Sequence, residues 1–120
     1  MKNIPDNKIL KVDLRTGEIS EELIKEQLSR KFIGARGIND WLLYSSMEPG
    51  KTDPLDPDNV TIFGAGLLAG TAMPAAGRLT ITSLNALNGA YGESSSSGYF
   101  ATELRNADNL RGKTTLTTIP

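Results

Sequence analysis

The sequence predicts one α+β domain, in which a mixed or antiparallel β-sheet with a hairpin packs against two to three helices. The chain has 120 residues, a length typical of a single domain. Short segments with alternating apolar residues indicate strands, and segments with apolar residues at helical spacing indicate helices. These two kinds of segment do not alternate in a regular strand–helix–strand order, so we do not expect a doubly wound fold.

Residues 8–20 predict the hairpin. Apolar and charged residues alternate over positions 10–14, as in a strand with one buried face. Gly17 follows, and glycine accepts the positive φ that a tight turn requires. The return strand begins directly after this turn.

Two helices are predicted next. Ser20 is a candidate N-cap for a helix over residues 21–30, and acidic residues in the first turn favour the helix dipole. A second helix is expected over residues 38–47, where apolar residues recur at i, i+3 and i+4 before a Pro-Gly pair. The segment 48–59 is rich in proline and aspartate and indicates a surface loop.

The second half of the chain predicts strands and a last helix. A short apolar strand begins at residue 60 and ends in a glycine-rich turn. Alternation over residues 74–83 predicts a strand that places Arg78 on the same face as two threonines. Helical spacing returns over residues 98–106, and residues 111–120 are either a short strand or a disordered end.

Composition excludes several classes of site. Thirteen basic residues balance fourteen acidic ones, so the net charge of −1 predicts neither a nucleic-acid nor a membrane partner. The sequence has no cysteine and no histidine, which excludes disulfides, Cys/His zinc sites, cysteine-ligated iron–sulfur clusters and Ser-His-Asp triads within this chain. The absence of an apolar leader or a long apolar run predicts a cytoplasmic location.

The most unusual segment is AYGESSSSGYF, residues 90–100. Its serines come just before the predicted last helix, so Ser96 or Ser97 is a candidate N-cap. Free N–H groups and the positive end of the dipole at a helix start attract anions, and serine hydroxyls add donors. The alternative is a serine-rich cap that binds no ligand.

Other candidates are weaker. Arg78 directly follows a glycine, and its guanidinium can present a planar pair of donors to a phosphate; the alternative is an outward-facing arginine on a half-solvated sheet. The glycine pair in residues 32–40 matches no phosphate-loop pattern and more simply marks a helix boundary. Glu93 and Glu103 are expected to be solvated surface carboxylates.

Four segments together resemble the N-terminal part of the tungsten-containing aldehyde:ferredoxin oxidoreductase family. They are KILKVDLRTGEIS, FIGARGIN, DPLDPDNVTIFGAGLLAGTAMPAAGR and SGYFATEL. Their order and spacing agree with the family from about residue 8 to residue 108. The resemblance therefore divides the chain into an incomplete N-terminal-like domain over residues 1–108 and a divergent tail over residues 109–120.

The resemblance implies a function for this domain. It is the base on which a tungsten (or molybdenum) bis-pterin dithiolene cofactor lies, with a magnesium ion that bridges the two pterin phosphates. The complete enzyme oxidises an aldehyde to a carboxylic acid. Electrons pass to ferredoxin through an iron–sulfur cluster whose cysteines belong to later domains.

The resemblance also implies binding residues, although no catalytic residue is expected in this chain. Arg78 matches an arginine that lies between pterin and cluster. Ser95, Ser96, Ser97 and Gly98 match the loop that contacts the pterin, and Ser95 stands at the magnesium position. Relatives carry asparagine where this chain has Ser95 and glycine where it has Ser97, and a backbone carbonyl from serine serves a hard cation equally well.

The expected partners are the rest of the enzyme or a partner subunit, ferredoxin through the full enzyme, and a second copy of the chain through an exposed apolar face. Alone, the chain is expected not to oxidise aldehydes. The alternative functions are a non-catalytic binding or assembly module that keeps the fold without the cofactor, and a generic phosphate-binding domain.

Overall fold

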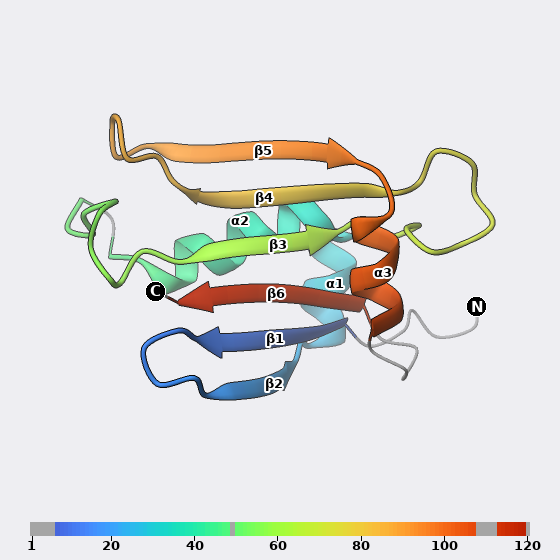
Figure 1. Cartoon of the computed structure of the whole chain (residues 1–120), viewed down its shortest axis with the longest axis horizontal. Coiled ribbons are helices and arrows are strands. Elements are labelled where there is room, and N and C mark those ends of the chain that lie inside the picture. The colour runs from blue at the N-terminus through green and yellow to red at the C-terminus, as the bar shows by residue number, and fades with distance from the viewer. Residues whose placement is uncertain (1–6, 49, 108–112, 120) are drawn as a thin grey trace.

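The protein forms one six-stranded mixed β-sheet with helices on both faces (Figure 1). A computed structural model describes residues 7–48, 50–107 and 113–119. The strands lie in the order β2-β1-β6-β3-β4-β5. In chain order the elements are β1 (Asn7–Asp13), β2 (Ile19–Leu23), α1 (Glu26–Phe32), α2 (Ala35–Ser46), β3 (Thr61–Ala65), β4 (Arg78–Leu84), β5 (Tyr91–Ser97), α3 (Phe100–Ala107) and β6 (Lys113–Ile119). The predicted α+β class is confirmed.

Strand β6 joins the two halves of the sheet. It runs parallel to β1 and antiparallel to β3, whereas every other pair of neighbouring strands is antiparallel. The tail at residues 113–119 is therefore a central strand, the first of the two alternatives that the sequence left open. The division of the chain at residue 108 stays a prediction.

Each face of the sheet has its own core. Helices α1 and α2 lie behind the sheet in Figure 1, and α3 lies in front of it. The α2 side buries Ile9, Ile24, Ile38, Leu42, Leu43, Val60, Ile62 and Leu84. The α3 side buries Ala65, Ala69, Leu79 and Ala101. The predicted alternation along β4 is confirmed, because Leu79 faces α3 whereas Thr82 hydrogen-bonds to a residue of α2.

The helix predicted over residues 21–30 is wrong in its first half. Ser20 pairs with Lys11 in the hairpin, so it is a strand residue and caps no helix. Helix α1 begins only at Glu26, and no side chain caps its start. The acidic residues after Ser20 form ion pairs with lysines of β1 instead of occupying a helical first turn. Cross-strand pairing therefore outweighed the local capping pattern.

The serine run is also not a helix cap. Residues 91–97 form the edge strand β5, in which Ser97 lies opposite Arg78 and Ser95 lies opposite Thr80. Helix α3 starts at Phe100, after the chain has turned at Gly98 with a φ of 141°. Pairing with β4 gives hydrogen-bond partners to the backbone N–H and C=O groups along one side of the serine run. A helix cap would not provide partners for this whole run.

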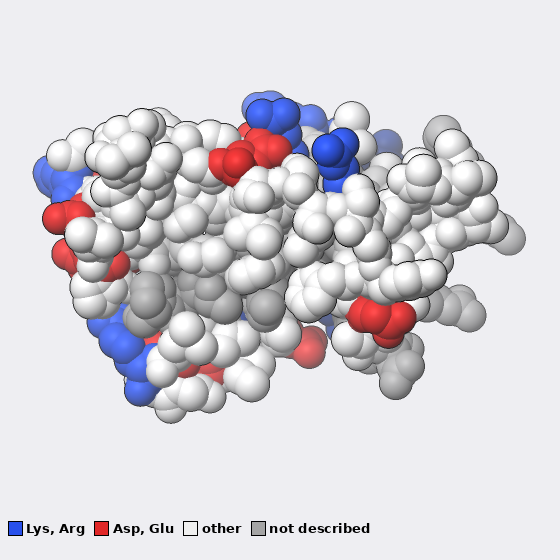
Figure 2. Space-filling model, turned by 45° about the horizontal axis from the view of Figure 1, so that its top comes forward, with Lys and Arg blue, Asp and Glu red and all other residues white. Residues whose placement is uncertain are grey.

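Charged groups of both signs are mixed on the face of the molecule that Figure 2 shows. On the face seen in Figure 2, positive and negative side chains lie beside one another near the margins, and most of the face is uncharged. In the described part of the chain, no helix has the length and apolarity needed to cross a membrane.

Candidate functional site

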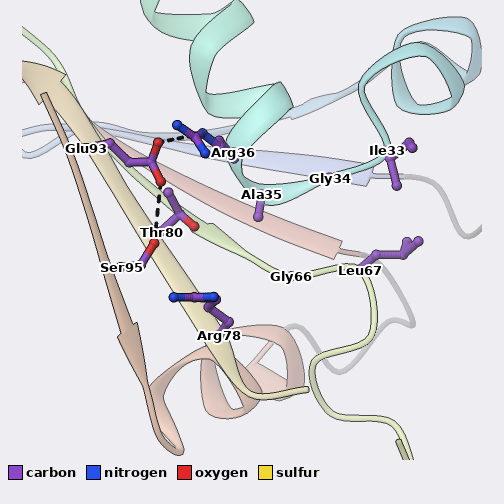
Figure 3. Close-up of a pocket in the computed structure, with 10 residues that line it drawn as sticks. All are labelled: Ile33, Gly34, Ala35, Arg36, Gly66, Leu67, Arg78, Thr80, Glu93 and Ser95. Carbon is purple, nitrogen blue, oxygen red and sulfur yellow. Dashed lines mark hydrogen bonds and ion pairs between the residues drawn. The ribbon is translucent and has the colours of Figure 1, made fainter. Parts of the chain in front are cut away.

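One end of the β4–β5 pair forms a cleft with the start of α2, which we call the first cleft (Figure 3). Its volume is about 360 Å³. Three parts of the fold contribute walls: the turn into α2, the loop after β3, and one face of β4 and β5. The lining residues are Ile33, Gly34, Ala35, Arg36, Gly66, Leu67, Arg78, Thr80, Glu93 and Ser95.

The turn into α2 has an unusual backbone. Ile33 has a φ of 62° and Ala35 a φ of 32°, values that are rare for residues with a Cβ and especially for a β-branched one. Gly34 is the N-cap, and no side chain caps the helix there. The first N–H groups of a helix have no intrahelical acceptor, and the helix dipole makes this end positive. The Gly37 N–H donates to the Gly34 carbonyl at 3.1 Å, which leaves the N–H groups of Ala35 and Arg36 as candidate donors to an anion in the cleft.

Arg78 places a cation in the same cleft. Its guanidinium extends from β4 into the space that Figure 3 shows. Among the contacts of the described residues, its side chain has no hydrogen bond and no ion pair, whereas Arg36 is bound to Glu93 with Nε 2.6 Å from Oε2. Arg78 is thus available to pair with an anionic ligand.

Glu93 is the acceptor of a small polar network. Besides Arg36, it accepts a hydrogen bond from the Ser95 hydroxyl at 3.5 Å, and the Tyr91 hydroxyl oxygen lies 3.1 Å from its Oε2. Its side chain is only 17% exposed, so the expectation of a solvated surface carboxylate is wrong for Glu93. Tyr91 donates its single hydroxyl proton to Asp40 of α2, at the shorter distance of 2.5 Å. Burial and then this hydrogen bond raise the pKa of Tyr91 from 10.0 to about 12.

Two buried or half-buried side chains hold the cleft walls in place. Arg105 of α3 donates to the carbonyl of Gly66 at 3.0 Å and also to that of Leu67, and burial lowers the pKa of its guanidinium. Asn39 of α2 is fully buried and donates to the Thr80 carbonyl at 3.1 Å. These contacts connect the loop after β3 and strand β4 to helices on opposite faces of the sheet.

A second cleft lies at the start of α3. Its volume is about 550 Å³, and its lining consists of Gly70, Thr71, Met73, Ala75, Ala76, Gly77, Ser97, Gly98, Tyr99 and Thr102. None of these side chains is charged. A Cβ on Gly77 would lie 2.7 Å from the Gly98 carbonyl oxygen, so glycine is needed for the two segments to pack this closely.

The residues predicted from the sequence divide between the two clefts. Arg78 and Ser95 line the first, and Ser97 and Gly98 line the second. Ser96 lines neither, and its hydroxyl contacts the Ser97 carbonyl at 3.4 Å. The strand register nevertheless places Ser97 directly opposite Arg78.

Sequence reasoning missed the wall formed by the start of α2. Residues 32–40 were assigned to a helix boundary, and Gly34 does mark one as the N-cap of α2. The same boundary also lines the first cleft through Gly34, Ala35 and Arg36. The glycine pair was the pattern that could have identified it. Within the described ranges, no group of three or more acidic, histidine or cysteine residues is arranged to hold a metal.

Comparison with known proteins decides the family. The sequence profile of the aldehyde ferredoxin oxidoreductase N-terminal domain matches residues 9–110. The chain belongs to this family. The resemblance carried by the four segments is therefore confirmed.

Relatives include the tungsten-containing aldehyde ferredoxin oxidoreductases of Pyrococcus abyssi, at 40% identity, and Pyrococcus furiosus, at 39% identity, each over 100 residues. These matches cover 83% of this chain but 16% of the relatives, so the chain spans about a sixth of their length. The fold is also similar to a chain of the active-site complex BamBC of benzoyl coenzyme A reductase in complex with 1,5-dienoyl-CoA. That match has a TM-score of 0.88 and 26% identity, and covers 99% of this chain and 18% of the other.

Proposed function

We propose that this chain is the cofactor-binding N-terminal part of a tungsten (or molybdenum) bis-pterin oxidoreductase that oxidises aldehydes to carboxylic acids, with ferredoxin as electron acceptor. Membership in the family supports the proposal. The structural observation that carries it is the first cleft, where the unpaired guanidinium of Arg78 and the uncapped start of α2 line one space. Both groups bind phosphoryl oxygens well.

The residues present fit a phosphorylated pterin. A volume of about 360 Å³ is at the lower end of small-molecule sites, which fits one portion of a large cofactor better than the whole. When bound, the metal–pterin group supplies the redox chemistry. This chain binds the phosphoryl end and orients it, while the iron–sulfur cluster is held by later parts of the enzyme.

Each predicted residue has a role in this proposal. Arg78 pairs with a phosphoryl group, and Ser95 offers an oxygen atom to the bridging magnesium, because Mg²⁺ accepts hard oxygen ligands. Ser96 and Ser97 continue β5 beyond Ser95, and Gly98 follows in the turn, so a part of the cofactor that extends beyond the first cleft would reach them. The small side chains of this segment let a bulky ligand approach the backbone of β5.

Binding of inorganic pyrophosphate to the 120-residue chain tests the proposal. Titration followed by amide chemical shifts is expected to perturb residues at the start of α2 and around Arg78. Arg78→Gln should weaken binding by about tenfold, since one hydrogen bond to a charged group contributes roughly 1.5–3 kcal/mol. Arg15→Gln, in the exposed hairpin turn, is the matched control. Equal affinity in the two variants would contradict the proposed site.

An assembly function is the second candidate, and one observation favours it. Apolar side chains are exposed at the second cleft: Tyr99 is 86%, Met73 58% and nearby Phe100 56% exposed. Exposed apolar groups of this size are typical of surfaces that bind protein. In this proposal the rest of the enzyme, a partner subunit or a second copy of the chain covers them. Light scattering that gives a monomer mass at every concentration would exclude the second copy.

The isolated chain is proposed to be inactive towards aldehydes. It has no cysteine and no histidine, so it cannot ligate the cluster through thiolates or supply an imidazole base. The measurement is aldehyde-dependent reduction of a viologen dye by the purified chain. Turnover in that assay would contradict the proposal.

A further inference from the structure

The first cleft contains an acid as well as cationic groups. Glu93 extends from β5 into the cleft, with Thr80 and Ser95 between it and Arg78 (Figure 3). A site for a simple anion has no need of a carboxylate, which repels the ligand. The presence of Glu93 therefore indicates that the part of the ligand that lies away from Arg78 is not anionic.

The two oxygens of Glu93 are used unequally. Oε2 accepts the short contact from Arg36 at 2.6 Å and lies 3.1 Å from the Tyr91 hydroxyl oxygen. Among the described residues, Oε1 accepts only the Ser95 hydroxyl, at 3.5 Å, the outer limit for a hydrogen bond. A carboxylate oxygen takes about two hydrogen bonds. Oε1 therefore keeps the capacity for at least one strong donor.

The surroundings hold this acceptor in a fixed orientation. Arg36 contacts Glu93 from α2, and Tyr91 contacts it from two residues away along β5. Tyr91 in turn is hydrogen-bonded to Asp40. Arg36 offsets the negative charge, which reduces repulsion of an anionic ligand. A side chain that is ordered before binding loses little conformational entropy when the ligand arrives.

We propose that Glu93 accepts a hydrogen bond from the N–H edge of the heterocyclic ring whose phosphoryl tail is bound by Arg78. The ligand class is a bipolar one: an anionic group at one end and an amino-substituted lactam ring, such as a 2-amino-4-oxopteridine, at the other. This inference rests on the proposed function, because it takes the ligand to be a phosphorylated pterin. Glu93 then selects an amino group over a carbonyl oxygen at the same ring position.

The test uses two rings without phosphate on the 120-residue chain. Pterin carries an amino group at ring position 2, and lumazine carries a carbonyl oxygen at the same position. A carboxylate repels this carbonyl oxygen. We expect the wild-type chain to bind pterin about tenfold more tightly than lumazine, as expected for one hydrogen bond to a charged acceptor. Glu93→Gln should remove this preference, and Glu103→Gln, on the exposed side of α3, should keep it. Amide chemical shifts report binding in all six titrations, of two rings into three chains.

The outcomes separate the inference from the proposed function. Equal affinity of the wild-type chain for pterin and lumazine, or no binding of either ring, overturns the inference without the need for any variant. A preference that survives in folded Glu93→Gln overturns it as well. Pyrophosphate titrated into the wild-type chain tests the anion site separately. Failure of pyrophosphate to bind, with the ring preference intact, contradicts the proposed phosphoryl site alone.

Discussion

The two clefts at the end of the β4–β5 pair are built alike but differ in charge. Each lies at the start of a helix, α2 for the first and α3 for the second, and the two helices cover opposite faces of the sheet. Arg36, Arg78 and Glu93 line the first cleft, whereas the second has no charged lining residue. The second is also the larger, at about 550 Å³ against 360 Å³.

The difference shows that a helix start alone does not define a site. Both helices have a positive N-terminal end. In the first cleft, the Arg78 guanidinium and the Glu93 carboxylate, which is held by Arg36, line the same space as that end. In the second, glycines and exposed apolar side chains such as Tyr99 suit a packed protein surface instead. We therefore propose a small ligand for the first cleft and a protein partner for the second.

The largest expected effect comes from the residue beneath the first cleft. Asn39→Ala removes the donor to the carbonyls of Ile62 and Thr80, which stay buried. We expect a loss of about 2 kcal/mol in the free energy of unfolding, because the buried hydrogen bonds of the Asn39 amide are lost at roughly 0.5–1.5 kcal/mol each, partly offset by removal of the unpaired Asn39 Oδ1. Urea denaturation measures it. Ser45→Ala, on the exposed side of α2, should change stability by less than about 0.5 kcal/mol.

A second substitution should disturb the second cleft. In Gly77→Ala the new Cβ would meet the Gly98 carbonyl oxygen at 2.7 Å, so the backbone must move. Forced backbone shifts of this kind cost about 1–3 kcal/mol. Gly66→Ala in the first cleft is the matched comparison, since its Cβ would lie 3.5 Å from the nearest atom. Equal melting temperatures for the two variants would show that the close packing at Gly77 is unimportant.

A smaller effect is expected at Arg105. Arg105→Gln shortens the donor that holds the carbonyls of Gly66 and Leu67, so the wall of the first cleft loses its connection to α3. We expect about 1 kcal/mol of lost stability and weaker pyrophosphate binding. Arg30→Gln removes an exposed i,i+4 ion pair with Glu26, worth roughly 0.3–0.5 kcal/mol, and should leave binding unchanged. Unaltered binding in Arg105→Gln would mean that the loop is held by other contacts.

The smallest effect is a pH dependence. The pKa of Tyr91 is about 12 in the folded chain, above its ordinary value of 10.0. The neutral hydroxyl therefore contributes its full stabilisation below pH 10, and this contribution is lost as the pH rises towards 12. Phenolate absorbance in the ultraviolet should show a late-titrating tyrosine that is missing in Tyr91→Phe. Loss of a component that titrates near pH 10 in Tyr91→Phe, with no late component in the wild-type chain, would contradict the network around Glu93.

The sequence predicted those features that depend on neighbouring residues. The hairpin around Gly17 and the alternation in β4 are local patterns, and the structure has both. The helix expected from Ser20 failed because pairing with β1 is not visible in the local sequence. The serine run failed for the same reason, since its partner is the more distant strand β4. Local preferences are weak beside such tertiary contacts.

The candidate site was predicted only in part. Arg78 was identified from its chemistry, and it lines the first cleft together with Ser95. The wall from α2 and the orientation of Glu93 arise only when α2 crosses β4 and β5, a contact that no spacing along the chain encodes. Arg36 and Glu93 meet although 57 positions separate them, as the residue numbers of the pair show.

The central position of β6 has a consequence for how the protein is made. Strand β1 pairs with β6 from Asn7 opposite Lys113 onwards, so the hairpin at the start of the chain reaches the rest of the sheet only through residues 113–119. Closing so long a loop is entropically costly, and pairings between distant segments slow folding. On the ribosome the first hairpin therefore emerges long before β6, and the inner edge of β1 stays unpaired until residues 113–119 have been synthesised.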